Sequence, residues 1–167
     1  DGMKMVLQNI VSFIVLVLLQ VLVLNNIHFM GYVNPYIYVL FILLLPVRFS
    51  RHFILILAFV LGLLIDIFSN TYGIHAFSTV LVAYLRPFAI NLFTNIEEDT
   101  NPIPSFNSFG MFAFSKYVIT LVFIHHTSFF LLEVFSFTAF GHTLLRIVLN
   151  TLITTIILLG ICAVKRE

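Results

Sequence analysis

Long apolar runs separated by short polar turns make up most of the chain, and this pattern predicts membrane-spanning helices. A helix needs about 20 apolar residues to cross about 30 Å of hydrocarbon, because it rises about 1.5 Å per residue. Six segments meet or approach this length, which predicts an all-α, polytopic membrane protein with six transmembrane helices in one bundle. The predicted segments are Met5–Leu24, Asn34–Val47, Phe53–Phe68, Ile74–Phe93, Phe109–Phe137 and Thr143–Val164.

The second segment is the shortest of the six. Asn34-Pro35 suits a helix cap and first turn, but Pro46 ends the apolar run after about 18 Å of helix. A short, tilted or partly re-entrant helix is therefore expected here. Three tyrosines near its start are expected to anchor the chain at the outer membrane interface: Tyr32, Tyr36 and Tyr38.

The composition fits a membrane protein over the whole length. The 167 residues are 61% hydrophobic and 9% charged, with a mean hydropathy of +1.13, whereas soluble domains are about 45–50% apolar and about 25% charged. A single integral membrane domain is expected over residues 3–167, with Asp1 and Gly2 as residues left from expression. The few basic residues are dispersed, so nucleic-acid binding is not expected.

Basic residues determine the orientation, because cytoplasmic loops are enriched in Lys and Arg. With the N-terminus inside, six crossings place seven of the eight basic residues at or near the cytoplasmic side, and only Arg146 outside. Both termini are therefore expected in the cytoplasm. The seven residues are Lys4, Arg48, Arg51, Arg86, Lys116, Lys165 and Arg166.

Polar residues within the spans recur at helical spacing, so each set is expected to face the inside of the bundle. Gly62 lies one turn before Asp66 and should let a neighbouring helix approach the same face, which makes the carboxylate tolerable there. The predicted inward stripes are Gln8, Ser12 and Gln20; Gly62 and Asp66; His75, Thr79, Ala83 and Arg86; and Thr143, Arg146, Asn150 and Thr154.

Asp66 and His75 flank a turn-like link, and two interpretations of them stay open. Intramembrane residues of this kind often belong to proton or solute pathways. Alternatively, they form a polar lock between helix ends at the outer interface, with Asn70 and Gly73 making residues 69–73 a tight turn that caps both helices.

His125, His126 and Glu133 suggest a metal site at first sight, but their spacing argues against one. Adjacent histidines diverge by about 100° on a helix, and the set matches no familiar ligand pattern. A polar network is favoured, with Glu133 paired to Arg146 of the next helix. No metal or cofactor is expected, and no Ser, Cys or Thr lies in a recognisable catalytic motif, so an enzyme is not expected.

Several short motifs follow one another in a specific order: Pro35, Leu45-Pro46, Gly62-Leu63, Asp66, Gly73, His75-Ala76 and Ala83-Tyr84-Leu85, then His125, His126 and Glu133. Their order and spacing resemble those of MreD, the rod shape-determining membrane protein family of bacteria. The resemblance covers about residues 30–140.

The resemblance implies a non-enzymatic scaffold of the cell-elongation machinery in the inner membrane, supporting peptidoglycan synthesis. It implies binding to an MreC-like bitopic protein, and indirectly to MreB, RodA and a class B penicillin-binding transpeptidase. MreD-like proteins are similar in fold to the six-helix substrate-binding subunits of energy-coupling-factor transporters. The alternative is therefore a substrate-binding subunit for a small, vitamin-like molecule, with a polar pocket around Asp66, His75 and the outer ends of the predicted segments Phe109–Phe137 and Thr143–Val164. Candidate partner-binding or pocket residues are Gly62, Asp66, Gly73, His75, Arg86, His126, Glu133 and Arg146.

Overall fold

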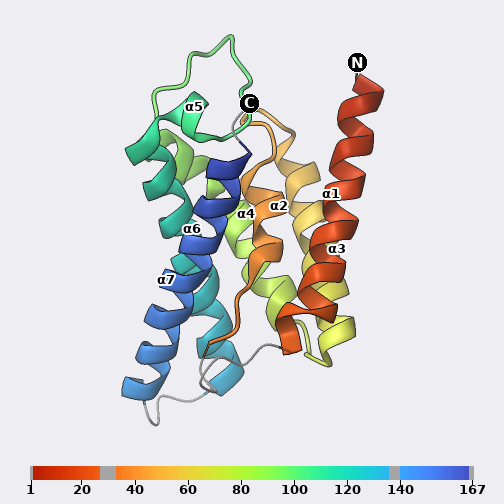
Figure 1. The fold of residues 1–167 in the computed structure, drawn as a ribbon, viewed down its shortest axis with the longest axis vertical. Coiled ribbons are helices and arrows are strands. Elements are labelled where there is room, and N and C mark those ends of the chain that lie inside the picture. Colours follow the sequence, from red (N-terminus) through yellow and green to blue (C-terminus); the bar gives the residue numbers. More distant parts are fainter. Residues whose placement is uncertain (1, 27–32, 136–139, 166–167) are drawn as a thin grey trace.

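The computed structural model describes residues 2–26, 33–135 and 140–165, and this part of the chain forms helices and no β-strand element. Five helices are long and apolar enough to cross a membrane: α1 (Gly2–Leu22), α3 (Arg51–Ser69), α4 (Ile74–Phe93), α6 (Met111–Val134) and α7 (Phe140–Val164) (Figure 1). The short elements are η1 (Leu24–Asn26), η2 (Ile37–Val39), α2 (Leu40–Leu43) and α5 (Phe106–Phe109). The chain is thus a helical protein with the features of a multi-pass membrane protein.

The second predicted span is the main difference from the sequence prediction. Only Ile37–Leu43 is helical, whereas a helix was predicted over Asn34–Val47. Two prolines explain this, because Pro35 and Pro46 each disfavour the helical conformation of the residue before them. We call Val33–Pro46 the threaded segment, since Figure 1 shows it running through the bundle between α1 and α7.

The start of the threaded segment is non-helical. The four residues Val33–Tyr36 can reach about 3.3 Å each, and they lead into one turn of 3₁₀-helix and one of α-helix, about 12 Å together. Leu44 and Leu45 do not extend the segment further, because their N–H groups bond back to the carbonyls of Leu40 and Ile42.

The long helices pack side by side in the order α3, α4, α6 and α7, with α1 against α3 and the threaded segment inside. Helices α3 and α4 are closest at Gly62, where an added Cβ atom would lie 2.5 Å from the Cα atom of Ala76. The close approach predicted for Gly62 is therefore confirmed.

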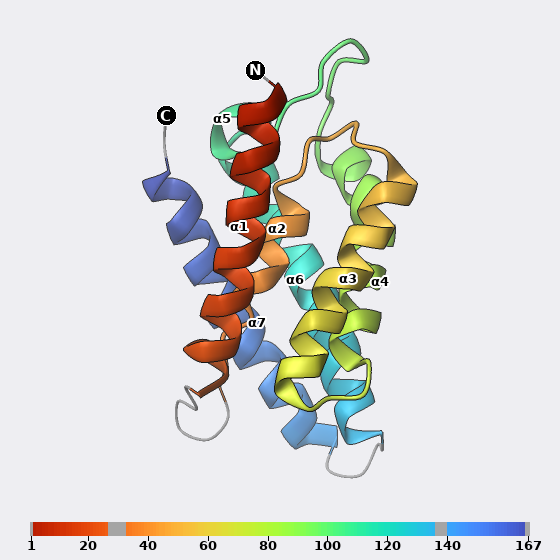
Figure 2. The same ribbon diagram turned by 90° about the vertical axis from the view of Figure 1, so that its right-hand side faces the viewer.

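Both ends of the described chain lie at the same end of the molecule. Helix α1 begins and α7 ends there, and α3 and α6 also begin there, as Figures 1 and 2 show. Lys4, Arg51, Lys116 and Lys165 accordingly lie near this end, while Arg146 is near the start of α7 at the other. Arg166 and Tyr32 lie outside the described residues.

Two predictions about side-chain direction were wrong. Tyr36 and Tyr38 are 6% and 0% exposed and lie inside the bundle, not at an interface. The predicted inward stripe of α1 fails in its first half, since Gln8 is exposed and only Gln20 is buried. The predicted stripes of α3 and α4, by contrast, do face inward, since all their members are buried: Gly62, Asp66, His75, Thr79, Ala83 and Arg86.

Candidate functional site

Asp66, near the end of α3, is the most densely bonded carboxylate in the described part of the chain. Its Oδ1 accepts hydrogen bonds from the Thr71 hydroxyl (2.5 Å), the His75 backbone N–H (3.0 Å) and His75 Nδ1 (2.9 Å). Its Oδ2 accepts one from the Ala76 backbone N–H (3.0 Å). Asp66 therefore caps the first turn of α4 from the neighbouring helix, which satisfies two of the N–H groups that every helix start leaves open.

Local backbone geometry brings Asp66 to this position. Asn70 ends α3 in the left-handed conformation (φ 55°), and Gly73 starts α4 with φ 88°, where glycine is favoured. Gly62 lets α4 approach the same face of α3 one turn earlier. The predicted tight turn over residues 69–73, capping both helices, is confirmed.

His75 completes this first cluster. Its ring packs on Phe129 of α6, with ring centroids 4.6 Å apart, and its side chain is 3% exposed. When Nδ1 donates to Asp66, Nε2 is left as a buried acceptor, and it has no hydrogen-bond partner. The geometry of Asp66 and His75 is thus that of the predicted polar lock between helix ends.

A second group of polar side chains holds the extended start of the threaded segment. The Gln20 side chain of α1 donates to the Pro35 carbonyl (3.0 Å) and accepts from the Ile37 N–H (2.9 Å). From α7, Asn150 Oδ1 accepts from the Asn34 N–H (2.8 Å), and Thr154 accepts from the N–H of Tyr36. Non-helical backbone at membrane depth needs such partners, because lipid supplies none.

Arg86 and Tyr117 hold the other end of the threaded segment. The Arg86 guanidinium, 1% exposed, donates to the carbonyls of Leu45 and Pro46 and to the Tyr117 hydroxyl. Tyr117 in turn donates to the Leu43 carbonyl (2.7 Å). Leu45 and Pro46 follow the short helix α2, so the arginine supplies hydrogen-bond donors to carbonyls at its C-terminal end. The sequence analysis predicted Arg86 in the inward stripe of its helix, and here it is a buried cap.

The two adjacent histidines of α6 belong to a chain of hydrogen bonds. His126 Nδ1 faces the Val122 carbonyl (2.9 Å) and must carry a hydrogen, so its Nε2 accepts from the Thr154 hydroxyl (3.1 Å). His125 Nδ1 lies 3.2 Å from His126 Nδ1, and its Nε2 lies 2.5 Å from the Tyr38 hydroxyl. These tautomers are assigned from the network.

Both ends of this hydrogen-bond network are backbone groups. At one end Thr154 accepts from the N–H of Tyr36; at the other, Tyr38 contacts Thr79, which donates to the His75 carbonyl (2.6 Å). A peptide group neither takes up nor releases a proton readily, so neither end of this hydrogen-bond network is a titratable group. It joins α4, α6, α7 and the threaded segment as a structural network.

Glu133 and Arg146 form the ion pair predicted from the sequence. Arg146 donates to Glu133 Oε1 (3.3 Å). The Arg146 side chain is 24% exposed and that of Glu133 is 39% exposed. The guanidinium carbon of Arg146 also lies 4.6 Å from the centre of the Phe130 ring. The pair joins α6 to α7 near their connection.

The two intramembrane carboxylates have separate partners. Asp66 is bonded to Thr71, His75 and Ala76, while Glu133 is bonded to Arg146. Over the described residues, no group of three or more His, Cys, Asp or Glu side chains is arranged to hold a metal ion.

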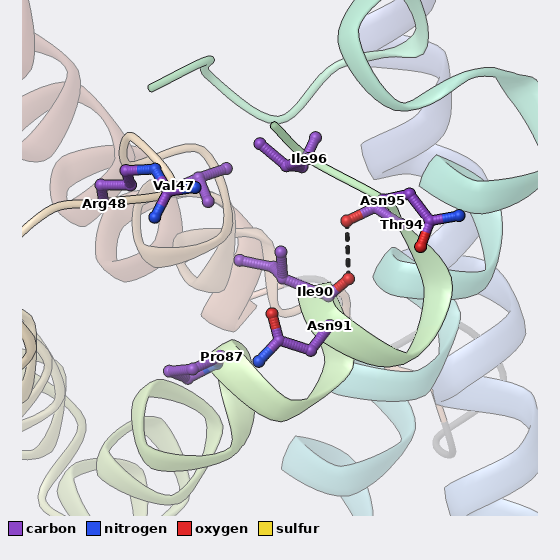
Figure 3. Close-up of a pocket in the computed structure, with 8 residues that line it drawn as sticks. All are labelled: Val47, Arg48, Pro87, Ile90, Asn91, Thr94, Asn95 and Ile96. Carbon is purple, nitrogen blue, oxygen red and sulfur yellow. Dashed lines mark hydrogen bonds between the residues drawn. The ribbon is translucent and has the colours of Figure 1, made fainter. Parts of the chain in front are cut away.

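Three cavities lie away from the Asp66 cluster. One, of about 450 Å³, lies between the end of α4 and the loop after the threaded segment, and Arg48, Asn91 and Asn95 line it (Figure 3). Arg48 is already engaged there, donating to the carbonyls of Thr100 and Glu97. The others are apolar grooves of about 420 Å³ between α1 and α3, and about 350 Å³ between α6 and α7.

The candidate residues therefore form three groups. Gly62, Asp66, Gly73 and His75 make the α3–α4 lock; Glu133 and Arg146 join α6 to α7. His126 and Arg86 hold the threaded segment, from opposite halves. Sequence reasoning predicted that Gln20, Asn150 and Thr154 face inward but missed that they bind the backbone of the threaded segment, and it missed Tyr117 altogether. A carboxamide deep in an apolar helix was the available signal for Gln20.

The described part of the chain thus forms a helical protein with five helices long and apolar enough to cross a membrane, in which several buried polar side chains bind the chain's own backbone. No protein-family model, curated protein or solved structure matches the chain significantly.

Proposed function

We propose that this chain is a non-enzymatic membrane adaptor of the bacterial cell-elongation machinery, similar to MreD. It crosses the inner membrane six times, counting the threaded segment, and supports peptidoglycan synthesis by binding an MreC-like bitopic protein. Through that partner it is linked to MreB, RodA and a class B penicillin-binding transpeptidase. The ordered motifs over about residues 30–140 support this assignment.

One structural observation carries the adaptor role: four of the buried polar side chains serve the chain's own backbone. Gln20, Asn150 and Arg86 hold the threaded segment, and Asp66 caps α4. A solute pathway requires polar groups that are free to bind and release a passenger. A bundle in which these four side chains hold the threaded segment and the start of α4 suits a scaffold that presents its helix surfaces to partners.

The orientation proposed places both termini in the cytoplasm. Helix ends carrying Lys4, Arg51, Lys116 and Lys165 meet at one end of the bundle, and Arg146 lies near the other. This distribution follows the enrichment of Lys and Arg in cytoplasmic loops.

The test is affinity purification of the tagged full-length chain from the membranes of a rod-shaped bacterium, followed by mass spectrometry. An MreC-like protein should be enriched over a tagged, unrelated multi-pass protein, and depletion of the chain should turn rods into spheres. Absence of any such partner in mild detergent, together with unchanged cell shape, would refute the proposal.

A second candidate function is a substrate-binding subunit for a small, vitamin-like molecule, in a bundle similar to those of energy-coupling-factor transporters. The polar cavity of about 450 Å³ at the end of α4 favours it, since this volume suits a small ligand. A thermal-shift screen with vitamins and lipid-linked precursors tests it. A reproducible rise in melting temperature, abolished by Asn91→Leu, supports this function; no shift across the screen argues against it.

A further inference from the structure

Helix α1 is the least buried of the five long helices. In its most apolar stretch of 18 residues, 17% are buried, against 33% to 44% in the other four. Its buried residues are Leu16, Val17 and Gln20, all in the second half. The first half therefore stands away from the bundle, and Figure 2 shows α2 in the space between α1 and α3.

An apolar groove of about 420 Å³ lies beside this first half of α1. Met5, Asn9 and Phe13 form one wall at a spacing of four residues, which places them on one helix face. Phe53 and Leu57 of α3 form the opposite wall, again four residues apart. Each wall is a row of side chains four residues apart, and the groove is about two helical turns long. The side-chain ridge of a third helix packs into a groove of this shape.

Asn9 is the polar exception in this groove. It lies about 10 Å along α1 from Gly2, and Ser12 follows about one turn deeper. Within the described part of the chain, neither side chain makes a hydrogen bond. Gln20 of the same helix, in contrast, bonds to three groups.

A carboxamide facing hydrocarbon indicates a protein occupant of the groove rather than an acyl chain. Lipid tails offer no hydrogen bond, so the carboxamide is costly against them. Ser, Thr, Asn and Gln side chains of a neighbouring transmembrane helix do offer one, and such contacts join helices in membranes.

We propose that the groove between α1 and α3 binds the single transmembrane helix of a bitopic partner. That helix places apolar side chains against Phe41 and Leu57 and a Ser, Thr, Asn or Gln beside Asn9. This inference rests on the proposed adaptor function and assigns the partner's binding surface to it.

Site-specific photo-crosslinking in intact membranes tests the surface. The full-length chain carries p-benzoyl-phenylalanine in place of Ile10, which lines the groove, or in place of Leu152, which lines the groove between α6 and α7. These two positions are 51% and 48% exposed, so they are matched for accessibility. Co-expression with the MreC-like protein should give a crosslink to its transmembrane segment from position 10 and not from position 152.

Substitution of Asn9 supplies the second measurement. Asn9→Leu should weaken retention of the MreC-like protein about three- to tenfold, the range for one interhelical polar contact, and Asn9→Gln should restore part of it. The melting temperature of the free chain should not fall, because Asn9 has no internal partner to lose. Thr120→Val, in the other groove, is the matched control and should leave retention unchanged.

The outcomes separate the surface from the function. If the MreC-like protein still co-purifies but crosslinks only from position 152, the groove between α1 and α3 is not its binding surface, and the adaptor role is left intact. Crosslinks between two copies of this chain, or a retained complex with no protein crosslinked at position 10, also overturn it. Loss of all co-purification from the wild-type chain removes the adaptor function itself.

Discussion

Removing the Asp66 carboxylate should destabilise the protein more than an ordinary point substitution. Asp66→Leu leaves four donors without their acceptor: the Thr71 hydroxyl, the His75 ring, and the backbone N–H groups of His75 and Ala76. The hydroxyl can rotate and the ring can change tautomer, but the two N–H groups in the first turn of α4 are fixed. A buried donor without a partner costs about 1–3 kcal/mol, so we expect a loss of about 4 kcal/mol.

A graded series separates capping from simple loss of polarity. Asp66→Asn keeps one oxygen for the donors at Oδ1 but places an NH₂ group against the Ala76 N–H, so we expect about half the loss, about 2 kcal/mol. The control is Cys162→Ala in α7, a half-buried position with a free thiol, where about 1 kcal/mol or less is expected.

The assay is thermal unfolding of the purified full-length chain in one detergent, followed by size-exclusion fluorescence. For a chain of this length, about 4 kcal/mol corresponds to a fall of roughly 10 °C in melting temperature, if the scaling of soluble domains applies. The melting temperature of Asp66→Leu should lie well below that of the Cys162→Ala control. A difference of 2 °C or less, about 1 kcal/mol on that scale, would refute the argument that these bonds lock α3 to α4.

The remaining predictions concern packing and the threaded segment. Gly62→Ala should cost about 1–3 kcal/mol, because its Cβ atom would overlap the backbone of α4; Gly160→Ala, with open space around it, should cost nothing in the same melt. Arg86→Leu leaves buried carbonyls unpaired and should sharply reduce the monodisperse fraction on size exclusion; a normal profile would contradict its role as a cap. Tyr38→Phe should lower stability by about 1–2 kcal/mol through the lost hydroxyl contacts. The control Tyr72→Phe, at a 99% exposed position, should have no effect. Equal melting temperatures of the two variants would contradict the network.

The sequence was sufficient to predict the long helices because length and hydropathy largely decide which segments cross a membrane. The predicted span Ile74–Phe93 has the bounds of α4, and the prediction for α3 is two residues short at its start and one at its end. The turn at Asn70 and Gly73 was predictable for a local reason, since both residues tolerate the left-handed conformation.

The threaded segment was not predictable in the same way. Its composition is as apolar as that of a spanning helix, and its backbone partners are remote in sequence: Asn34 bonds to Asn150, and Tyr36 to Thr154. Tyr36 and Tyr38 were assigned to an interface because tyrosine usually lies there. Here the buried hydroxyl of Tyr38 has partners from α4 and α6, which only the packed bundle supplies.

The dependence of the threaded segment on Asn150 and Thr154 also imposes an order on biogenesis. Translation produces Asn34 and Tyr36 116 and 118 residues before their partners Asn150 and Thr154, so their N–H groups have no acceptors from α7 while the nascent chain leaves the ribosome. In hydrocarbon each unmatched peptide group costs several kcal/mol. The segment therefore gains its full set of backbone partners only after the last helix has been inserted.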